Sequence, residues 1–389
     1  MRTTWDRILT THVGSLPRPE DLAELLQADD RGDKIDQAGL KTRVAGAVDE
    51  MVKRQAEAGI DIVSDGEMSK VHFSTYVRRC LKGVGPGDPG GLGSGRRHGD
   101  LLDHPDFADW VKDSQGKSRR GFMTPTCKAE VSYGDKAPLK TDLANLKSAV
   151  GKAGAKAAFV PSASPGTVSR FVNNTHYKTD DAYLEALSEA MRVEYEEIAA
   201  AGFDVQLDCP DLASHRHSRH QDLTDAEFLK IAAHHIEAFN HSVRNIPRDQ
   251  IRLHVCWGNY EGPHTRDIDF RKIAPVIFTA KARAFLFEGA NPRHHHEWED
   301  FKKADVPDDV ILVPGVIDSC TNFVEHPKLV AQRICNWAGV VGKERVMAGT
   351  DCGFGTFAET RRRVAPSVVW SKFKSLAEGA ALATKRLWS

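Results

Sequence analysis

The residues best suited to chemistry in this chain of 389 residues lie near the ends of short apolar segments. The stretch LHVCWGN, at 253–259, places His254 two residues before Cys256. Alternate residues of a strand point the same way, so both side chains can face one site. An imidazole and a thiolate are zinc ligands, and a catalytic zinc needs about three protein ligands and one open position.

Two further side chains of this kind follow apolar segments downstream, Glu288 in LFEGA and Cys352 in GTDCGFG. Alone, an H-x-C pair more often reflects a buried histidine beside a small apolar cysteine, and Cys352 could equally belong to the core. Glu288 is harder to explain in that way, because an unpaired buried carboxylate is costly. Four such groups near the ends of three predicted strands favour a metal site.

Amphipathic helical patterns alternate with short apolar segments, which predicts parallel βα units. Two segments nearly repeat each other: 41–67 ends in EAGIDIVSDGE, and 181–211 ends in AAGFDVQLDCPD. In each, a glycine ends the helical pattern and an aspartate follows that glycine by six residues. In the second segment the apolar residues fall on one helical face, and Gly202 is a plausible helix C-cap.

Eight strands are predicted in this way, near residues 9–15, 60–64, 156–162, 203–207, 251–257, 284–290, 310–318 and 345–351. They predict one α/β domain over residues 1–389, a (β/α)8 TIM barrel, and the norm of roughly 250 residues leaves room for insertions. A doubly wound open sheet is the alternative, but no GxGxxG motif follows an early strand.

The insertions are recognisable by composition. The glycine-rich run GVGPGDPGGLGSGRRHG at 83–99 predicts a loop after the second strand, and segment 83–125 is either a surface loop or a lid over the barrel mouth. The stretch 126–135 is predicted as a hairpin outside the barrel. An insertion after the sixth strand carries His294, His295 and His296, for which a partly solvated loop is expected, although one histidine could compete with Glu288 for zinc. Residues 361–363, all arginine, are expected at a solvated helix start, with contact to an anionic substrate such as a sulfonate or polyglutamate as the alternative.

Composition narrows the class of protein. The chain has 53 basic and 54 acidic side chains, and a net charge of −1 argues against nucleic acid or an anionic membrane as its partner. No apolar run reaches the roughly 18 residues of a membrane span, and the start lacks the pattern of a signal peptide. Seven thinly spread cysteines suit reduced thiols, so a cytoplasmic protein is expected.

Seven stretches together resemble the catalytic barrel of cobalamin-independent methionine synthase and its relatives, which include the epoxyalkane:coenzyme M transferases. They run in order along nearly the whole chain and are far more specific together than any one motif. The stretches are THVGSLPRP at 11–19, DIVSDGEMSK at 61–70, VQLDCPDLA at 205–213, LHVCWGN at 253–259, FLFEGANPRH at 285–294, VPGVIDSCTN at 313–322 and AGTDCGFGT at 348–356.

The resemblance implies a (β/α)8 barrel in which zinc activates a thiol for alkylation. The implied zinc ligands are His254, Cys256, Glu288 and Cys352. The implied residues that bind an amino-acid thiol are Ser15, Glu67 and Asp208. A free thiol of pKa near 8.5 is mostly protonated at pH 7, whereas a metal-bound thiol is deprotonated, and carboxylates suit an ammonium group.

The expected function is therefore zinc-dependent methyl transfer to homocysteine or a related thiol. The alternative within enzymes is epoxide opening by a coenzyme-M-like thiol, whose sulfonate would need cationic residues in place of Glu67 and Asp208. A non-catalytic barrel with structural zinc is less favoured, because such sites usually have four Cys or His ligands. A decarboxylase of the same fold would have no need of the H-x-C pair.

Three departures from the family concern the alkyl donor. Cys320 occupies the position of the histidine proposed as the family's acid, and Cys209 replaces an acidic residue after the strand-end aspartate. The amino-terminal barrel of full-length methionine synthases, which helps to hold polyglutamyl folate, is also missing. We therefore expect poor use of methyl-folate, and a better leaving group in a methylated corrinoid, a sulfonium or a strained epoxide. A thiol is a weaker acid than an imidazolium, which is the physical reason.

Overall fold

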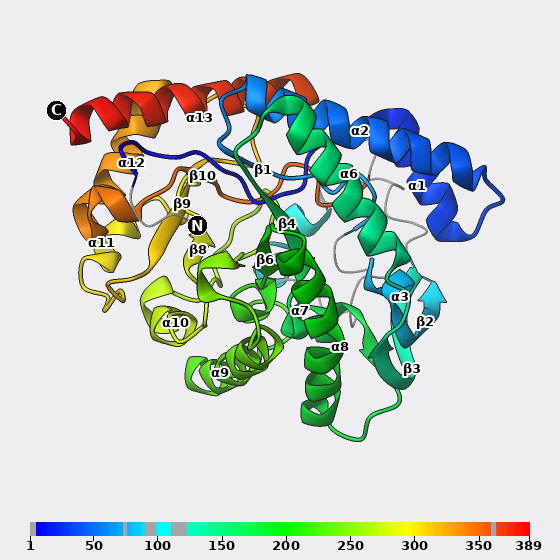
Figure 1. Ribbon diagram of the computed structural model, residues 1–389. Coiled ribbons are helices and arrows are strands. Elements are labelled where there is room, and N and C mark those ends of the chain that lie inside the picture. The colour runs from blue at the N-terminus through cyan, green and yellow to red at the C-terminus, as the bar shows by residue number, and fades with distance from the viewer. Residues whose placement is uncertain (1–4, 73–75, 90–98, 110–122, 359–362) are drawn as a thin grey trace.

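One curled parallel sheet forms the centre of an α/β fold in the computed structural model, which describes residues 5–72, 76–89, 99–109, 123–358 and 363–389 (Figure 1). The order of the strands across this sheet is the same as their order along the chain. Every neighbouring pair is parallel, as βα units require. The seven strands are β1 (Ile62–Val63), β4 (Ala157–Ala163), β6 (Asp204–Asp208), β7 (Ile251–His254), β8 (Ala284–Phe287), β9 (Ile311–Ile317) and β10 (Gly349–Thr350).

The structure therefore contains seven of the eight predicted strands as a half-barrel. The predicted first strand forms only an isolated parallel bridge, between Thr10 and Ala348. Its backbone nevertheless contacts both edges of the sheet. The Thr11 N–H donates to the Ala348 carbonyl at 2.9 Å, and the Ile62 N–H donates to the Thr10 carbonyl at 3.1 Å.

Helices lie around the outside of the central strands (Figure 1). Helix α8 shows why: the Thr179 hydroxyl caps its start by accepting from the Ala182 N–H, and Gly202 follows its end with a φ of 91°. Its buried face includes the apolar residues that the sequence places on one side. The main helices are α1 (Glu20–Arg31), α2 (Gln37–Glu57), α6 (Ala137–Ala153), α7 (Pro165–Phe171), α8 (Asp180–Ala200), α9 (Asp225–Ser242), α10 (Phe270–Ile277), α12 (Pro327–Val341) and α13 (Pro366–Leu387).

A second, three-stranded sheet lies outside the central one, in the order β2 (Leu81–Pro89), β3 (Met123–Tyr133) and β5 (Asn173–Asn174). The stretch 126–135 lies outside the main sheet as predicted, but it is not a hairpin, because residues up to Tyr133 form the single strand β3. The prediction of a loop from residue 83 is wrong as far as residue 89, because backbone pairing with β3 needs no side chains and so tolerates glycine. Residues 90–98 and 110–122 fall outside the described part of the chain, and α4 (Gly99–Asp103) lies between them.

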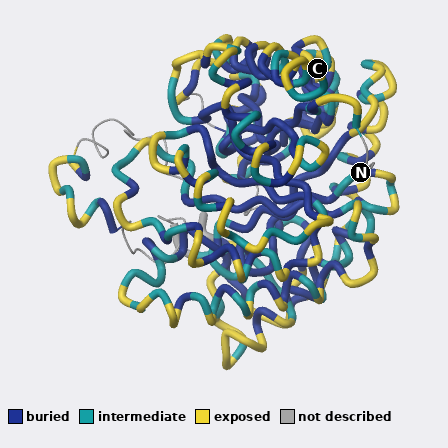
Figure 2. The backbone as a smooth tube through the Cα atoms, turned by 90° about the vertical axis from the view of Figure 1, so that its left-hand side faces the viewer, coloured by how far each residue is buried: buried dark blue, intermediate teal, exposed yellow. Residues whose placement is uncertain are grey.

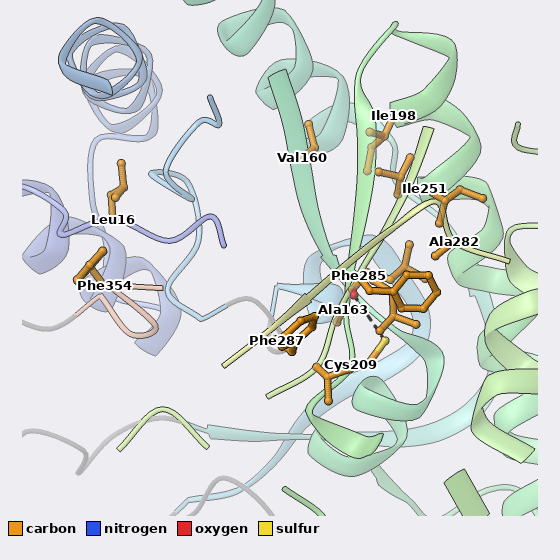
Figure 3. Close-up of a cluster of buried hydrophobic side chains, with 14 of the residues drawn as sticks. Leu16, Val160, Ala163, Ile198, Cys209, Ile251, Ala282, Phe285, Phe287 and Phe354 are labelled. Atoms are coloured by element: carbon orange, nitrogen blue, oxygen red, sulfur yellow. Dashed lines mark hydrogen bonds between the residues drawn. The ribbon is translucent and has the colours of Figure 1, made fainter. Parts of the chain in front are cut away.

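The core lies between the sheet and the helices, and the buried backbone runs through the middle of the molecule (Figure 2). Strand residues such as Val160, Ile251 and Phe285 meet helix residues such as Ile198 in one apolar cluster (Figure 3). Cys209 is 1% exposed and belongs to the same cluster. No helix among the described residues is long and apolar enough to cross a membrane.

Candidate metal and thiol site

The predicted site residues meet at the carboxyl ends of the parallel strands, where active sites of such folds lie. Asp208 is the last residue of β6 and His254 the last of β7, and the two are direct partners in the register of the sheet. Glu288 follows the last residue of β8, and Cys352 lies two residues beyond β10. Residues far apart in the sequence are thus positioned by strand ends alone.

Three of the four predicted metal ligands form one cluster. His254, Cys256 and Cys352 each offer a ligand atom, and these atoms lie within 4.8 Å of one another. The two Sγ atoms are 3.8 Å apart. In the described part of the chain, this is the one group of three or more His, Cys, Asp or Glu side chains that could hold a metal ion.

His254 is oriented by Asp208. Its Nδ1 lies 2.9 Å from Asp208 Oδ1, which indicates that Nδ1 carries a proton and donates it. Its Nε2 is buried and has no hydrogen-bond partner among the described residues. Burial lowers the pKa of His254, but the hydrogen bond and charge of Asp208 outweigh burial and raise it. A carboxylate behind a histidine in this way is the usual outer support of a metal ligand.

The pKa values of the two thiols are raised in this buried cluster. The hydrogen bond with Cys352, and then burial, raise the pKa of Cys256 well above its usual value. The hydrogen bond from Cys256 lowers the pKa of Cys352, but burial and the charge of Glu288 outweigh it and leave the pKa raised. A metal would deprotonate both thiols. An unpartnered imidazole nitrogen beside two cysteines therefore fits a soft or borderline ion such as zinc.

Glu288 stands beside this cluster and is not part of it. Its Oε1 accepts from the Trp257 N–H at 2.9 Å, and its Oε2 accepts from Asn291 Nδ2 at 2.8 Å. The segment that carries it is tied to β10, because Asp351 Oδ1 accepts from the Gly289 and Ala290 N–H groups at 2.8 Å each. Burial raises the pKa of Asp351 to about 7.

The predicted thiol-binding residues share one pocket with the cluster. A cavity of about 220 Å³, here called the candidate pocket, has Ser15, Glu67 and Asp208 in its wall. Glu288 and Cys320 are not among its lining residues. The complete lining is Val13, Ser15, Glu67, His72, Arg170, Phe171, Asp208, Pro210, Ser214, His254, Cys256, Gly258, Asn259, Tyr260, Cys352, Gly353, Thr356 and Phe357.

Glu67 has the features of a functional residue. It is 2% exposed, and its backbone has a φ of 60°, which is unfavourable for a residue other than glycine. Burial raises its pKa from 4.5 to about 7, although the charges of Lys70 and Arg18 act in the opposite direction. Arg18 Nη2 lies 3.5 Å from Glu67 Oε2. Strain and a shifted pKa at a pocket are typical of sites that act on ligands.

Cys320 lies behind the pocket wall. Its Sγ is 3.3 Å from Oδ1 of Asn259, a lining residue, and 3.4 Å from Arg363 Nη1. Burial raises the pKa of Cys320 to about 12, although Arg363 lowers it. Arg363 precedes α13, near the predicted helix start, while Arg361 and Arg362 lie outside the described residues.

The expectation of a solvated loop at 294–296 is wrong for His294, which is 3% exposed. Asp267 binds it: Asp267 Oδ2 lies 3.3 Å from His294 Nε2, and the same carboxylate contacts His217 at 2.8 Å and His264 at 2.9 Å. His294 Nε2 is 3.9 Å from Glu288 Oε2. Three histidines around one buried carboxylate had no signal in the sequence, since they come from three separate loops.

Comparison with known proteins shows which family and fold the chain resembles. A family model described as the catalytic domain of cobalamin-independent synthase matches residues 8–84. Two solved structures share the fold over 98% of this chain: a B12-independent methionine synthase from Shewanella sp. W3-18-1, with a TM-score of 0.72 at 20% identity, and a putative one from Listeria monocytogenes, with 0.67 at 18%. Each of these two matches also covers 99% of the neighbour's own chain.

Particular relatives extend the likeness along the whole chain. A methionine synthase of Saccharolobus islandicus is 23% identical over 97% of this chain and 95% of its own. A 2-hydroxypropyl-CoM lyase of Xanthobacter autotrophicus is 25% identical over 89% of each chain. The chain is thus similar both to methionine synthases and to a 2-hydroxypropyl-CoM lyase. The resemblance to the cobalamin-independent methionine synthases, predicted from the sequence, is confirmed.

The raised pKa of Glu67 predicts a pH-dependent stability. A carboxyl whose pKa rises on folding stabilises the protein fully below its unfolded value near 4.5, and this stabilisation is lost as pH rises through about 7. In urea unfolding at pH 5 and pH 8, Glu67→Gln should reduce the difference in unfolding free energy by up to about 3 kcal/mol. The exposed Glu50→Gln should leave that difference unchanged. If the unfolding free energy changes equally between pH 5 and pH 8 in wild type and Glu67→Gln, the pKa of Glu67 is not raised in the folded protein.

Proposed function

We propose that this chain is a zinc-dependent transferase that alkylates a small thiol, with methyl transfer to homocysteine or a related thiol as its reaction. The single observation that supports it best is the His254 imidazole, whose buried Nε2 has no hydrogen-bond partner in the described part of the chain while two cysteines lie in the same cluster. His254, Cys256 and Cys352 would hold the metal, and Glu288 would complete the set when no substrate is bound. When bound, zinc would keep the substrate thiol deprotonated at neutral pH.

The chain's own residues supply orientation and charge. Asp208 would hold His254 in the tautomer that presents Nε2, as it does in the hydrogen bond at 2.9 Å. Glu67 and Asp208 would bind an ammonium group, with Ser15 beside them in the pocket wall. Ser15 is held close to the metal residues, since a Cβ at Gly353 would lie 2.0 Å from its Oγ.

Epoxide opening by a thiol that carries a sulfonate is the second candidate, and the likeness to the 2-hydroxypropyl-CoM lyase supports it. The two reactions share the thiolate and differ in the group that the pocket must neutralise at the other end of the thiol. Glu67 and Asp208 favour an amino-acid thiol, because two carboxylates would repel a sulfonate.

We also propose that residues 1–389 form a single catalytic domain with an eight-stranded barrel, in which the segment around Thr10 is the eighth strand. Its hydrogen bonds to Ala348 and Ile62 support this closure. Helix α4, within the segment 83–125 that the sequence predicts as a surface loop or a lid, is proposed to lie near the pocket mouth, because the Tyr260 hydroxyl at the pocket wall donates to Asp100. Seven unpaired cysteines support a cytoplasmic location.

The experiment that tests the proposal is metal analysis of purified variants. Wild type should contain close to one zinc per chain, and Cys256→Ser and Cys352→Ser should each lose it. Asp208→Asn should weaken zinc binding by about 10- to 100-fold, because it removes the acceptor that orients His254. Cys335→Ser, on α12, is the matched control and should retain zinc. Full zinc in both Cys256→Ser and Cys352→Ser would contradict the site.

For the alkyl donor, we propose a group that leaves more readily than the amine of methyl-folate, namely a methylated corrinoid, a sulfonium or a strained epoxide. Support comes from Cys320, whose pKa of about 12 makes it a poorer acid than expected from its residue type alone. Even an unperturbed thiol of pKa near 8.5 is a weaker acid than an imidazolium near 6.5, by about two units or roughly 2.7 kcal/mol of driving force for protonating the departing amine, and burial of Cys320 weakens it further.

A donor panel with homocysteine as acceptor tests this. Methylcobalamin, a methylsulfonium or a small epoxide should react faster than the mono- or triglutamate of methyl-folate, and Cys320→His should increase the rate with methyl-folate selectively. Product formation is followed by mass spectrometry, and Cys335→Ser serves as the control. Methyl-folate as the fastest donor of wild type by far would show that the missing acid does not limit the reaction.

A further inference from the structure

The candidate pocket is also lined by a cationic side chain, Arg170, which has no role so far in the proposed metal site or in binding an ammonium group. Arg170 lies in the last turn of α7, which follows β4, and its side chain lines the pocket with Cys256 and Cys352. Its Nη1 donates to Ser214 Oγ at 2.6 Å. Ser214 also lines the pocket, and its N–H donates to the Cys256 carbonyl at 3.2 Å, so the guanidinium is fixed close to the proposed thiol site.

Arg170 has no carboxylate in direct contact among the described residues, although the charge of Asp211 is near enough to raise its pKa. Within the described ranges of the chain, no carboxylate oxygen lies within 4.0 Å of its guanidinium. The nearby Asp211 is bound by His235, Ser164 and Thr167. Burial lowers the pKa of Arg170 to about 10, so it stays charged at neutral pH. A charge partly withdrawn from water without an ionic partner is costly, and an anionic ligand would remove that cost.

We propose that Arg170 is the subsite for the anionic end of the thiol substrate, a carboxylate or a sulfonate. This rests on the proposed function. The pocket of about 220 Å³ is small, so a short thiol with its sulfur at the cysteines would place its far end at the pocket wall. Arginine suits this role, because its planar donors match two oxygens of such a group.

The pocket carboxylates then distinguish the two kinds of anionic thiol. Asp208 already accepts from His254 at 2.9 Å and from Gln206 at 3.0 Å, and Glu67 has Arg18 at 3.5 Å. An amino-acid thiol would use Arg170 for its carboxylate and Glu67 for its ammonium. A thiol with a sulfonate would use Arg170 alone.

Calorimetric titration of the full chain tests the subsite with four thiols: homocysteine, 2-mercaptoethanesulfonate, cysteamine and 2-mercaptoethanol. In Arg170→Gln, the first two should bind at least about 30-fold more weakly, while the last two, which carry no anion, should change by less than about 3-fold. Arg170→Lys should give an intermediate loss. Arg363→Gln removes an exposed cation near the pocket and should preserve the affinity for both anionic thiols.

The outcomes separate the sources and the two proposals. If the Arg170 variants lose affinity for homocysteine alone, the subsite binds a carboxylate. If they lose affinity for 2-mercaptoethanesulfonate alone, it binds a sulfonate, and if they lose affinity for both, it accepts either group. Equal affinities of wild type and both Arg170 variants for all four thiols would overturn the subsite. Ethanesulfonate and 2-aminobutyrate, which lack a thiol, should also depend on Arg170. If they do while no thiol coordinates the metal, the subsite stands and the proposed function fails.

Discussion

The hydrogen bond between Asp208 and His254 is the interaction on which the proposed site depends. Both residues end parallel strands, and the register of β6 and β7 makes them direct partners, so the contact at 2.9 Å follows from the sheet itself. Without Asp208, the buried imidazole could rotate or change tautomer, and Nε2 would no longer face the two cysteines. Under the proposed function, a metal held by Nε2 would offset the cost of leaving this buried nitrogen unsatisfied.

The rest of the pocket surrounds this interaction with opposed charges. Asp351 ties the segment of Glu288 to the strand that leads to Cys352, so the fourth proposed ligand is kept at a distance while it binds backbone and amide donors. Glu288 would be the fourth residue to hold the metal under the proposed function. Glu67 and Arg170 offer opposite charges in the same pocket, which suits a substrate that carries charges of its own.

Much of the site could be predicted from the sequence, because strand alternation and strand ends are local features. His254, Cys256 and Cys352 meet as expected, and Ser15, Glu67 and Asp208 share their pocket. The direct role of Asp208 towards His254 depends on strand register, which composition does not reveal. The strand at 81–89 could not be predicted because its glycines lack the side-chain pattern of a strand, and they pair with β3 through the backbone alone. The burial of His294 depends on how separate loops pack, and the position of Arg170 depends on how α7 packs beside Ser214. No periodic pattern in the sequence predicts either.

X-ray absorption at the zinc edge, with and without homocysteine, tests the central claim most directly. The account predicts two sulfur neighbours near 2.3 Å, from Cys256 and Cys352, and a third when the thiol is added. The wild-type chain is sufficient for this measurement, and 2-aminobutyrate, which lacks sulfur, serves as the control ligand. A zinc site whose sulfur count does not change with any thiol would contradict the proposal that this chain alkylates a metal-bound thiolate.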